Sequence, residues 1–206
     1  MVAETLTPTL VWRMGLKWGR PMTRKIRYST FSTAMGFCAF AWHEGGICRF
    51  HLPVDLEDDA RAHLTRRLPN AEHSDPSAQA MDLLEKVRAY FTGQPVEFLD
   101  IQLDVGPQSD FFSTVYEIVR AMPWGTSKTY GEIAKELNAP PQAAQTVGQA
   151  MAKNPLPLLI PCHRVLATGG KPGGFSAEGG VKTKLQMLAL EGLFKNQPKP
   201  EQASLF

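Results

Sequence analysis

The length and composition set the first limits. The chain has 206 residues, room for one large domain or two small ones, and 43% of them are hydrophobic, which is ordinary for a protein with a buried core. No apolar stretch approaches the roughly 20 residues that cross a bilayer, and the first two dozen residues lack the apolar segment of a secretory signal. We therefore expect a cytoplasmic protein without membrane contact.

Cysteine and charge distribution narrow the choice further. Three cysteines without CxxC spacing argue against a disulfide framework and against a cysteine-rich zinc site. Residues 1–110 carry 12 Lys and Arg against 14 Asp and Glu, whereas residues 111–206 carry 10 against 6. The basic second half permits contact with a polyanion but does not require it.

The first half predicts a small sheet and two helices. Residues 1–22 are interpreted as an extension. Residues 23–52 alternate as strands do, with a hairpin turn at 43–46. Amphipathic helices are expected over about 56–68 and from after Pro76 until Thr92-Gly93 ends the second one, which places Met81, Leu84, Val87 and Phe91 on one face. Residues 101–105 alternate as a further strand. The break at Gly106-Pro107 predicts a boundary between an α/β domain over 23–106 and a second domain over 107–194.

The second half begins with helices. Ser109 and Asp110 are suited to cap a helix that ends at Pro123, and two short helices over 130–137 and 141–153 flank a tight turn at 138–140. This pair resembles a helix-turn-helix, although a generic helical hairpin gives the same pattern. The second helix carries small residues that allow close approach to another surface, such as the minor groove of DNA: Ala143, Ala144, Thr146, Gly148 and Ala150.

Chemistry is indicated at Cys162. An apolar, strand-like run leads into Pro161-Cys162-His163, and a glycine-rich loop follows. A cysteine in apolar surroundings is usually an inert packing residue. Here Pro161 fixes the chain entering the cysteine, and His163 beside it favours a nucleophilic thiolate.

The segment Pro161-Cys162-His163-Arg164-Val165 resembles the signature of the O6-alkylguanine-DNA alkyltransferases. The resemblance extends in order over residues 109–193, whereas the first hundred residues agree only in their general layout. It implies an α/β fold: a ribonuclease-H-like N-terminal domain with a small antiparallel sheet, and a helical, winged-helix-like C-terminal domain with the helix-turn-helix. It also implies a single-turnover transfer of the alkyl group from O6-alkylguanine, and from O4-alkylthymine, to the protein.

The resemblance assigns roles to individual residues. Cys162 is the acceptor, His163 its base through a bound water, and Glu191 the residue that orients His163. Asn154 braces the turn of the cysteine, and Tyr130 gives a proton to the leaving guanine. The partner is double-stranded DNA, bound through its minor groove with the damaged base rotated outward. The residues implied to contact the DNA or the flipped base are Gln145, Ala143, Ala144, Thr146, Gly148, Arg164, Val165, Phe175 and Ser176.

Two departures from the family pattern bear on this interpretation. Gln145 stands where the family has an arginine that fills the space of the flipped base, which predicts weaker flipping. Ala177 and Glu178 lengthen the loop after Ser176, which predicts a reshaped base pocket.

Two further features stay open. Cys38, His43, Cys48 and His51 lie close along one hairpin but lack zinc-finger spacing, so an ordinary hairpin is favoured over a zinc site. Residues 195–206 have the composition of a flexible tail, and its end resembles the short peptide with which bacterial repair proteins bind the sliding clamp. The residues that would bind the clamp are Gln202, Leu205 and Phe206.

Three functions of different classes fit the sequence. The first is the suicide DNA alkyltransferase. The second is a protein that binds alkylated DNA without repairing it, and the third is a thiol acceptor for a non-DNA substrate; Gln145 keeps both open. We expect a monomer without metal, nucleotide or other cofactor.

Overall fold

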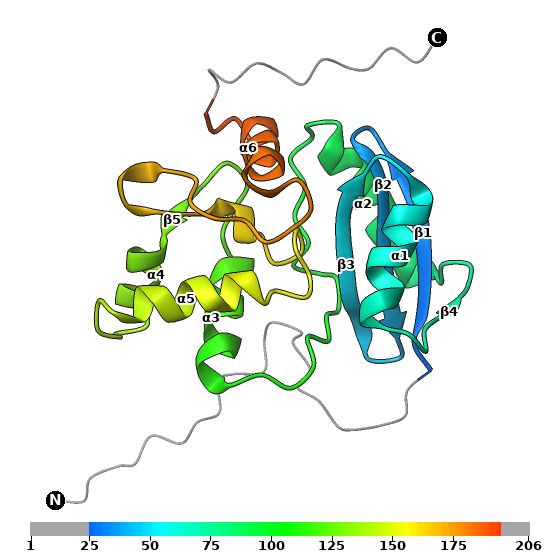
Figure 1. The fold of residues 1–206 in the computed structure, drawn as a ribbon, viewed down its shortest axis with the longest axis horizontal. Helices are drawn as coiled ribbons and strands as arrows, with labels where there is room; N and C mark the ends of the chain where they lie inside the picture. The colour runs from blue at the N-terminus through cyan, green and yellow to red at the C-terminus, as the bar shows by residue number, and fades with distance from the viewer. Residues whose placement is uncertain (1–24, 195–206) are drawn as a thin grey trace, which may run out of the picture.

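The computed structural model describes residues 25–194 (Figure 1). The first half builds a four-stranded sheet in the order β3-β2-β1-β4, from β1 (Arg27–Thr33), β2 (Gly36–His43), β3 (Gly46–Val54) and β4 (Glu72–His73). The first three strands pair antiparallel, and β4 pairs parallel with β1. Helices α1 (Glu57–Arg67) and α2 (Ala78–Phe91) cover opposite faces of this sheet.

The central strand explains why both faces are covered. Successive side chains of a strand point to opposite faces. In β2, Phe40 and Trp42 join the cluster that includes the buried residues of α2, whereas Ala39 and Ala41 pack with Ala60 and other residues of α1. The small alanines on the α1 side let that helix lie close to the sheet.

The second half is mainly helical. Its elements are α3 (Asp110–Arg120), β5 (Lys128–Thr129), α4 (Tyr130–Glu136), α5 (Ala143–Ala152), the 3₁₀ turns η1 (Cys162–Arg164) and η2 (Thr168–Gly170), β6 (Val165–Leu166) and α6 (Gly180–Leu190). Ser109 caps α3 by accepting a hydrogen bond from the Phe112 amide, and Thr129 and Glu132 form a capping box at α4. The turn between α4 and α5 is closed by Asn138, which has a φ of +52°.

Most predicted elements are confirmed, and three details are wrong. Residues 101–105 form no strand; they run beside β3 through one bridge, Ile47 to Leu103, so the alternation reflects contact with a sheet edge. The apolar run 156–160 folds as a turn with one bridge, Pro157 to Ile160, because Pro157 cannot donate to a ladder. Met81 is 41% exposed rather than in the core.

One core connects the two halves. A single cluster of buried hydrophobic side chains runs from Phe31 in β1 to Met187 in α6 and includes residues of α2, α3 and α5. The boundary near residue 106 therefore stays a prediction about organisation, because side chains from before and after it belong to the same cluster. Within residues 25–194, the structure has no helix long and apolar enough to cross a membrane.

Candidate functional site

Cys162 is the first residue of η1 and is 6% exposed. Its amide donates to the Ile160 carbonyl at 2.7 Å. Asn154 ties the preceding turn together, because its Nδ2 donates to that same carbonyl at 2.8 Å and its Oδ1 accepts from the Leu156 amide at 3.0 Å. The Asn154 side chain also hydrogen-bonds to Cys162. Asn154 therefore fixes the turn that presents the thiol.

His163 and Glu191 form a buried pair beside this turn. Nε2 of His163 lies 2.7 Å from Oε1 of Glu191, and both side chains are fully buried. The nitrogen facing a carboxylate carries the proton, so Nε2 is the donor and Nδ1 is the basic nitrogen. Nδ1 is buried and has no hydrogen-bond partner among the described residues. The pair thus holds a neutral imidazole with one basic nitrogen unoccupied.

Glu191 accepts hydrogen bonds from several parts of the chain. Arg164 donates from Nε at 2.9 Å and from Nη2 at 3.0 Å, and the Gly125 amide donates at 3.2 Å. The Tyr90 hydroxyl donates to Oε1 at 2.8 Å and lies 3.1 Å from His163 Nε2. A buried carboxylate is stable only when it is paired in this way.

The prediction that Arg164 contacts DNA is wrong. The side chain is buried, and its guanidinium is engaged by Glu191 and by the Met122 carbonyl. Its charge compensates the buried carboxylate and is not available at the surface. Arg164 thus belongs to the support of His163.

The protonation states follow from burial and pairing. Burial raises the pKa of the Cys162 thiol, although the Asn154 hydrogen bond and the Lys184 charge oppose it. Burial lowers the pKa of His163 despite the nearby Glu191. Burial also acts to raise the pKa of Glu191, but His163 and Arg164 outweigh it and bring the value to about 2. At rest the site holds a thiol, a neutral imidazole and a carboxylate, which is the nucleophile, base and orienter set of covalent catalysis.

A lysine and two aromatic rings lie near the thiol. Nζ of Lys184 donates to the carbonyl of the buried Val165 at 2.5 Å and lies 6.0 Å from the Tyr130 ring centroid and 5.9 Å from that of Phe175. Burial lowers the pKa of Lys184 to about 8, while the charge of Cys162 raises it. Burial raises the pKa of Tyr130, so its hydroxyl keeps its proton at neutral pH.

Sequence reasoning missed Tyr90 and Lys184. Lys184 does have a signal, because with Met187, Leu188 and Glu191 it follows the spacing of one helix face, and that face is buried. Tyr90 has none, since α2 precedes the Cys162 motif by seventy residues and a buried tyrosine there is equally suited to packing.

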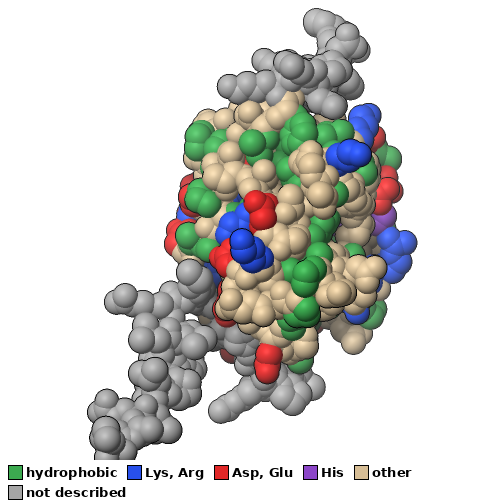
Figure 2. Space-filling model, turned by 90° about the vertical axis from the view of Figure 1, so that its left-hand side faces the viewer, with side chains coloured by type: hydrophobic (Ala, Val, Ile, Leu, Met, Phe, Trp, Pro, Cys, Tyr) green, Lys and Arg blue, Asp and Glu red, His purple; other side chains and the backbone are tan. Residues whose placement is uncertain are grey.

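Helix α5 presents a mixed surface. Gln145 is exposed, whereas Ala143, Ala144, Thr146 and Gly148 are half-buried. Gly148 faces Tyr130, because a Cβ added there would lie 4.0 Å from the ring. Figure 2 shows that the face on the α4 side carries few Lys and Arg side chains among hydrophobic and uncharged polar ones. Contact with a partner along this face would depend mainly on shape and uncharged groups.

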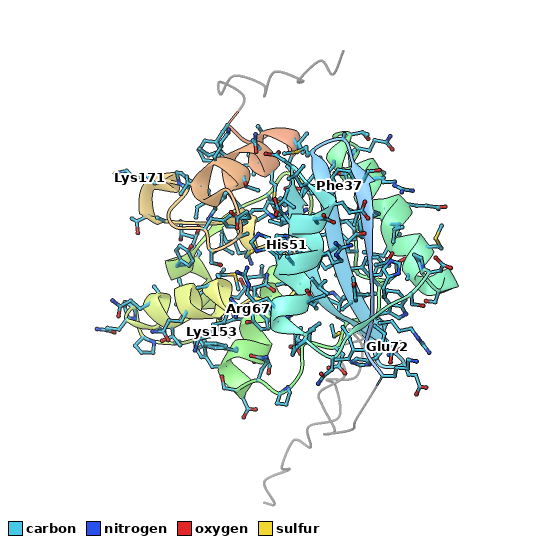
Figure 3. The ribbon with its side chains drawn as sticks, turned by 45° about the vertical axis from the view of Figure 1, so that its right-hand side comes forward. Phe37, His51, Arg67, Glu72, Lys153 and Lys171 are labelled. Atoms are coloured by element: carbon cyan, nitrogen blue, oxygen red, sulfur yellow. The ribbon has the colours of Figure 1, made fainter. Side chains whose placement is uncertain are left out.

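Cys162 also lines a cleft of about 620 Å³ between the two halves. The cleft is bounded by β3 and α1 on one side and by residues 151–155, Pro157 and residues 176–178 on the other. Figure 3 shows Arg67 of α1 beside Lys153, the residue that follows α5, with His51 of β3 nearby.

Of the four hairpin residues that could form a zinc site, three contact different neighbours. His43 pairs with Asp104 at 3.4 Å, His51 stacks on His63, and the Cys48 thiol donates to the Ala41 carbonyl at 3.5 Å. Over residues 25–194, no group of three or more His, Cys, Asp or Glu is arranged to hold a metal ion.

Comparison with known proteins places the chain in a family. Residues 110–193 match the model of the 6-O-methylguanine DNA methyltransferase DNA-binding domain. The methylated-DNA–protein-cysteine methyltransferase of Sulfolobus acidocaldarius is 37% identical over 169 residues, which cover 82% of this chain and 94% of that protein. A DNA base-flipping protein of Thermus thermophilus is 40% identical over 126 residues, 61% of this chain and 80% of that protein.

A solved structure agrees with this assignment over both halves. The crystal structure of Mycobacterium tuberculosis OGT in complex with DNA superposes with a TM-score of 0.64 at 33% identity and covers 80% of this chain and 92% of that one. Its α/β fold is therefore the fold of this chain, with a small, mostly antiparallel sheet joined to a helical half. The chain belongs to the methylated-DNA–protein-cysteine methyltransferase family.

Proposed function

We propose that this protein repairs DNA by transferring the alkyl group of O6-alkylguanine to Cys162 in a single, irreversible turnover. The observation that carries the proposal is the site itself. A thiol borders a cleft, and next to it lies a neutral imidazole that a buried carboxylate holds at 2.7 Å with its Nδ1 unoccupied. Cysteine acceptors and methylated DNA are named in the family that the chain belongs to.

The mechanism follows from the protonation states. His163 Nδ1 takes the proton of the Cys162 thiol through a bound water, and Glu191 stabilises the imidazolium that forms. The thiolate attacks the alkyl carbon, the carbon–O6 bond breaks, and its electron pair passes to the guanine. Tyr130, which keeps its proton at neutral pH, supplies a proton to a ring nitrogen. The thioether formed has no bond that water readily cleaves, so each molecule acts once.

The DNA is proposed to meet the helix-turn-helix formed by α4 and α5. The small residues of α5 suit a narrow minor groove, and Phe175 and Ser176 would border the flipped base. We also propose that the first half of the chain is ribonuclease-H-like and the second half winged-helix-like.

A second function is favoured by one observation. Gln145, the exposed residue of α5 where the family has an arginine, is less suited to hold the flipped state. A protein that binds the lesion without accepting the alkyl group, or a thiol acceptor for a non-DNA substrate, would tolerate that change. The Thermus relative is named a DNA base-flipping protein. Cys162 and its supported histidine favour transfer.

The decisive experiment is mass spectrometry of the cysteine peptides. The protein is incubated with duplex oligonucleotide containing O6-methylguanine, and we expect a methyl mass increase on Cys162 only. Cys162→Ala should abolish it, and Cys38→Ala and Cys48→Ala serve as matched controls that keep it. Tight binding without a mass change would establish the lesion-binding function, and alkylation by free O6-methylguanine but not by DNA the third function.

Two assembly proposals stand apart from the chemistry. Gln202, Leu205 and Phe206 lie outside the described residues, and we propose that this tail binds a sliding clamp. A peptide of residues 195–206 should bind a purified bacterial clamp, and Leu205→Ala with Phe206→Ala should abolish binding. We also propose a monomer, which light scattering tests.

A further inference from the structure

The cleft beside Cys162 is larger than a methyl transfer needs. Its volume is about 620 Å³, and it extends from Cys162 into the first half of the chain, to β3 and α1. A methyl group would occupy only the part next to the sulfur. The remaining volume is open to whatever the alkyl group carries beyond its first carbon.

This remaining volume is strongly basic. Four cationic side chains line it, against one carboxylate. The cations are Arg49, Arg66, Arg67 and Lys153, and the carboxylate is Glu178. Glu178 lies 3.8 Å from His63, and among residues 25–194 it forms no ion pair with these cations. Arg66 contacts His63 Nδ1 at 2.6 Å. The excess of positive charge is thus not neutralised within the cleft.

Arg49 and Arg67 are the most informative of these residues. Among residues 25–194 neither forms an ion pair, and Nε of Arg49 is buried without a hydrogen-bond partner. Burial lowers the pKa of Arg49, and the charge of Arg67 lowers it further, so the two guanidinium groups repel each other. An anion between them would relieve both the repulsion and the unsatisfied donor.

The depth of Arg49 indicates how such an anion arrives. A backbone phosphate stays on the outside of the protein, whereas the Arg49 side chain is half-buried on β3 in the same cleft as Cys162. A group that reaches both Arg49 and Cys162 must enter the cleft. The part of a lesion that enters is the alkyl substituent on O6.

We propose that this cleft binds the carboxylate of O6-alkyl groups that end in one, so that the protein accepts carboxyalkyl lesions in preference to neutral lesions of the same size. The inference rests on the proposed function. In the transfer, the Cys162 thiolate forms a bond to the carbon next to O6, the carbon–O6 bond breaks, and its electron pair goes to guanine, which takes a proton. The product is S-carboxyalkylcysteine, whose carboxylate lies between Arg49 and Arg67.

The test compares three duplexes that differ only at O6: methyl, carboxymethyl and the neutral carbamoylmethyl of matching shape. Single-turnover rates give the carboxymethyl to carbamoylmethyl ratio. We expect Arg49→Gln with Arg67→Gln to lower this ratio about tenfold or more, because each charged hydrogen bond to a carboxylate is lost. Arg49→Lys with Arg67→Lys should keep most of it. Arg61→Gln is the matched control, because Arg61 is exposed on α1, pairs with Asp58 and lies outside the cleft.

Each other outcome overturns the inference. An unchanged ratio in the glutamine variant with normal methyl transfer means that the arginines do not recognise the substituent. An equal slowing of all three substrates means that they contact the DNA backbone. Absence of methyl transfer by the unaltered protein would instead defeat the proposed function, so the two failures are distinguishable. The circular dichroism spectrum of each variant reports whether it is folded, so that an equal slowing can be assigned to lost DNA contact.

Discussion

Tyr90 is the residue through which the first half of the chain reaches the acceptor site. It is fully buried at the end of α2, and its hydroxyl contacts both Glu191 Oε1 and His163 Nε2. Burial, and then the charge of Glu191, raise its pKa, so the hydroxyl stays a donor. A donor to Glu191 withdraws charge from the carboxylate and so weakens its hold on the imidazole proton.

Tyr90→Phe should therefore change the chemistry as well as the fold. Loss of a hydrogen bond to a charged acceptor should lower the free energy of unfolding by about 1.5–3 kcal/mol. The pKa of His163 should rise, so the acid limb of the rate against pH should move to higher pH. Tyr116→Phe is the control, since that buried hydroxyl donates to the Ala150 carbonyl at 3.0 Å. Its variant should lose stability without moving the limb, and equal pH profiles for both variants would contradict the positioning role.

Gln145→Arg tests the position at which this chain lacks the arginine of the family pattern. A charged donor at this exposed position of α5 should stabilise the flipped state, and transfer from duplex DNA should rise about tenfold while transfer from the free base stays constant. Gln149→Arg adds the same charge one turn later on α5, also exposed. An equal rise in both variants would mean that the arginine acts only by general attraction to DNA.

At the scale of elements, the same substitution, glycine to alanine, can be compared in α5 and in α4. Gly148 lies within α5 and faces Tyr130, where an added Cβ would sit at ordinary contact distance, 4.0 Å from the ring. Gly148→Ala should raise stability by about 0.5–1 kcal/mol through helix propensity. It should also slow transfer from duplex DNA, because the methyl narrows the space between α5 and the proton donor. Gly131→Ala in α4 meets only Thr129 at 4.0 Å and should raise Tm without slowing transfer; comparable slowing in both would point away from Tyr130.

The elements that could be predicted from sequence are those with local causes. The hairpin at 43–46 and the helix begun by Ser109 follow from turn and capping residues, and the structure contains them. β4 could not be predicted, because two exposed residues form a strand only by pairing with β1.

The same distinction holds within the site. Cys162 and His163 are adjacent in the chain, so their motif could be recognised from the sequence alone. The burial of Arg164 was not, because it depends on Glu191, which lies 27 residues further along. Tyr90 and Glu191 are separated by 101 residues, and only the common core of the two halves brings their oxygens to 2.8 Å.

At the scale of the whole molecule, the buried charges make stability depend on pH. His163 has a pKa below its ordinary 6.5 in the folded protein, and Glu191 has one of about 2 against 4.5. Between the folded and the ordinary pKa of each group, the unfolded chain binds more protons than the folded one, so acid favours unfolding. The contribution of His163 begins to be lost as pH falls below 6.5, and that of Glu191 is lost as pH falls from 4.5 towards 2.

Urea unfolding at pH 7.5, 5.5, 4.0 and 3.0 should show this loss of stability. The steepest decline is expected below pH 4.5, where protonation of Glu191 removes up to about 3 kcal/mol from the free energy of unfolding. Glu191→Gln leaves the Arg164 charge buried without its carboxylate, so it should lower stability at pH 7.5 by about 3–5 kcal/mol. The same variant should lose the decline between pH 4.0 and 3.0, because the titrating group is gone. Glu85→Gln, at an exposed carboxyl of α2, should keep the wild-type decline. A Glu191→Gln protein as stable as the wild type at pH 7.5 would mean that the carboxylate is not what holds Arg164, His163 and Tyr90 together across the two halves.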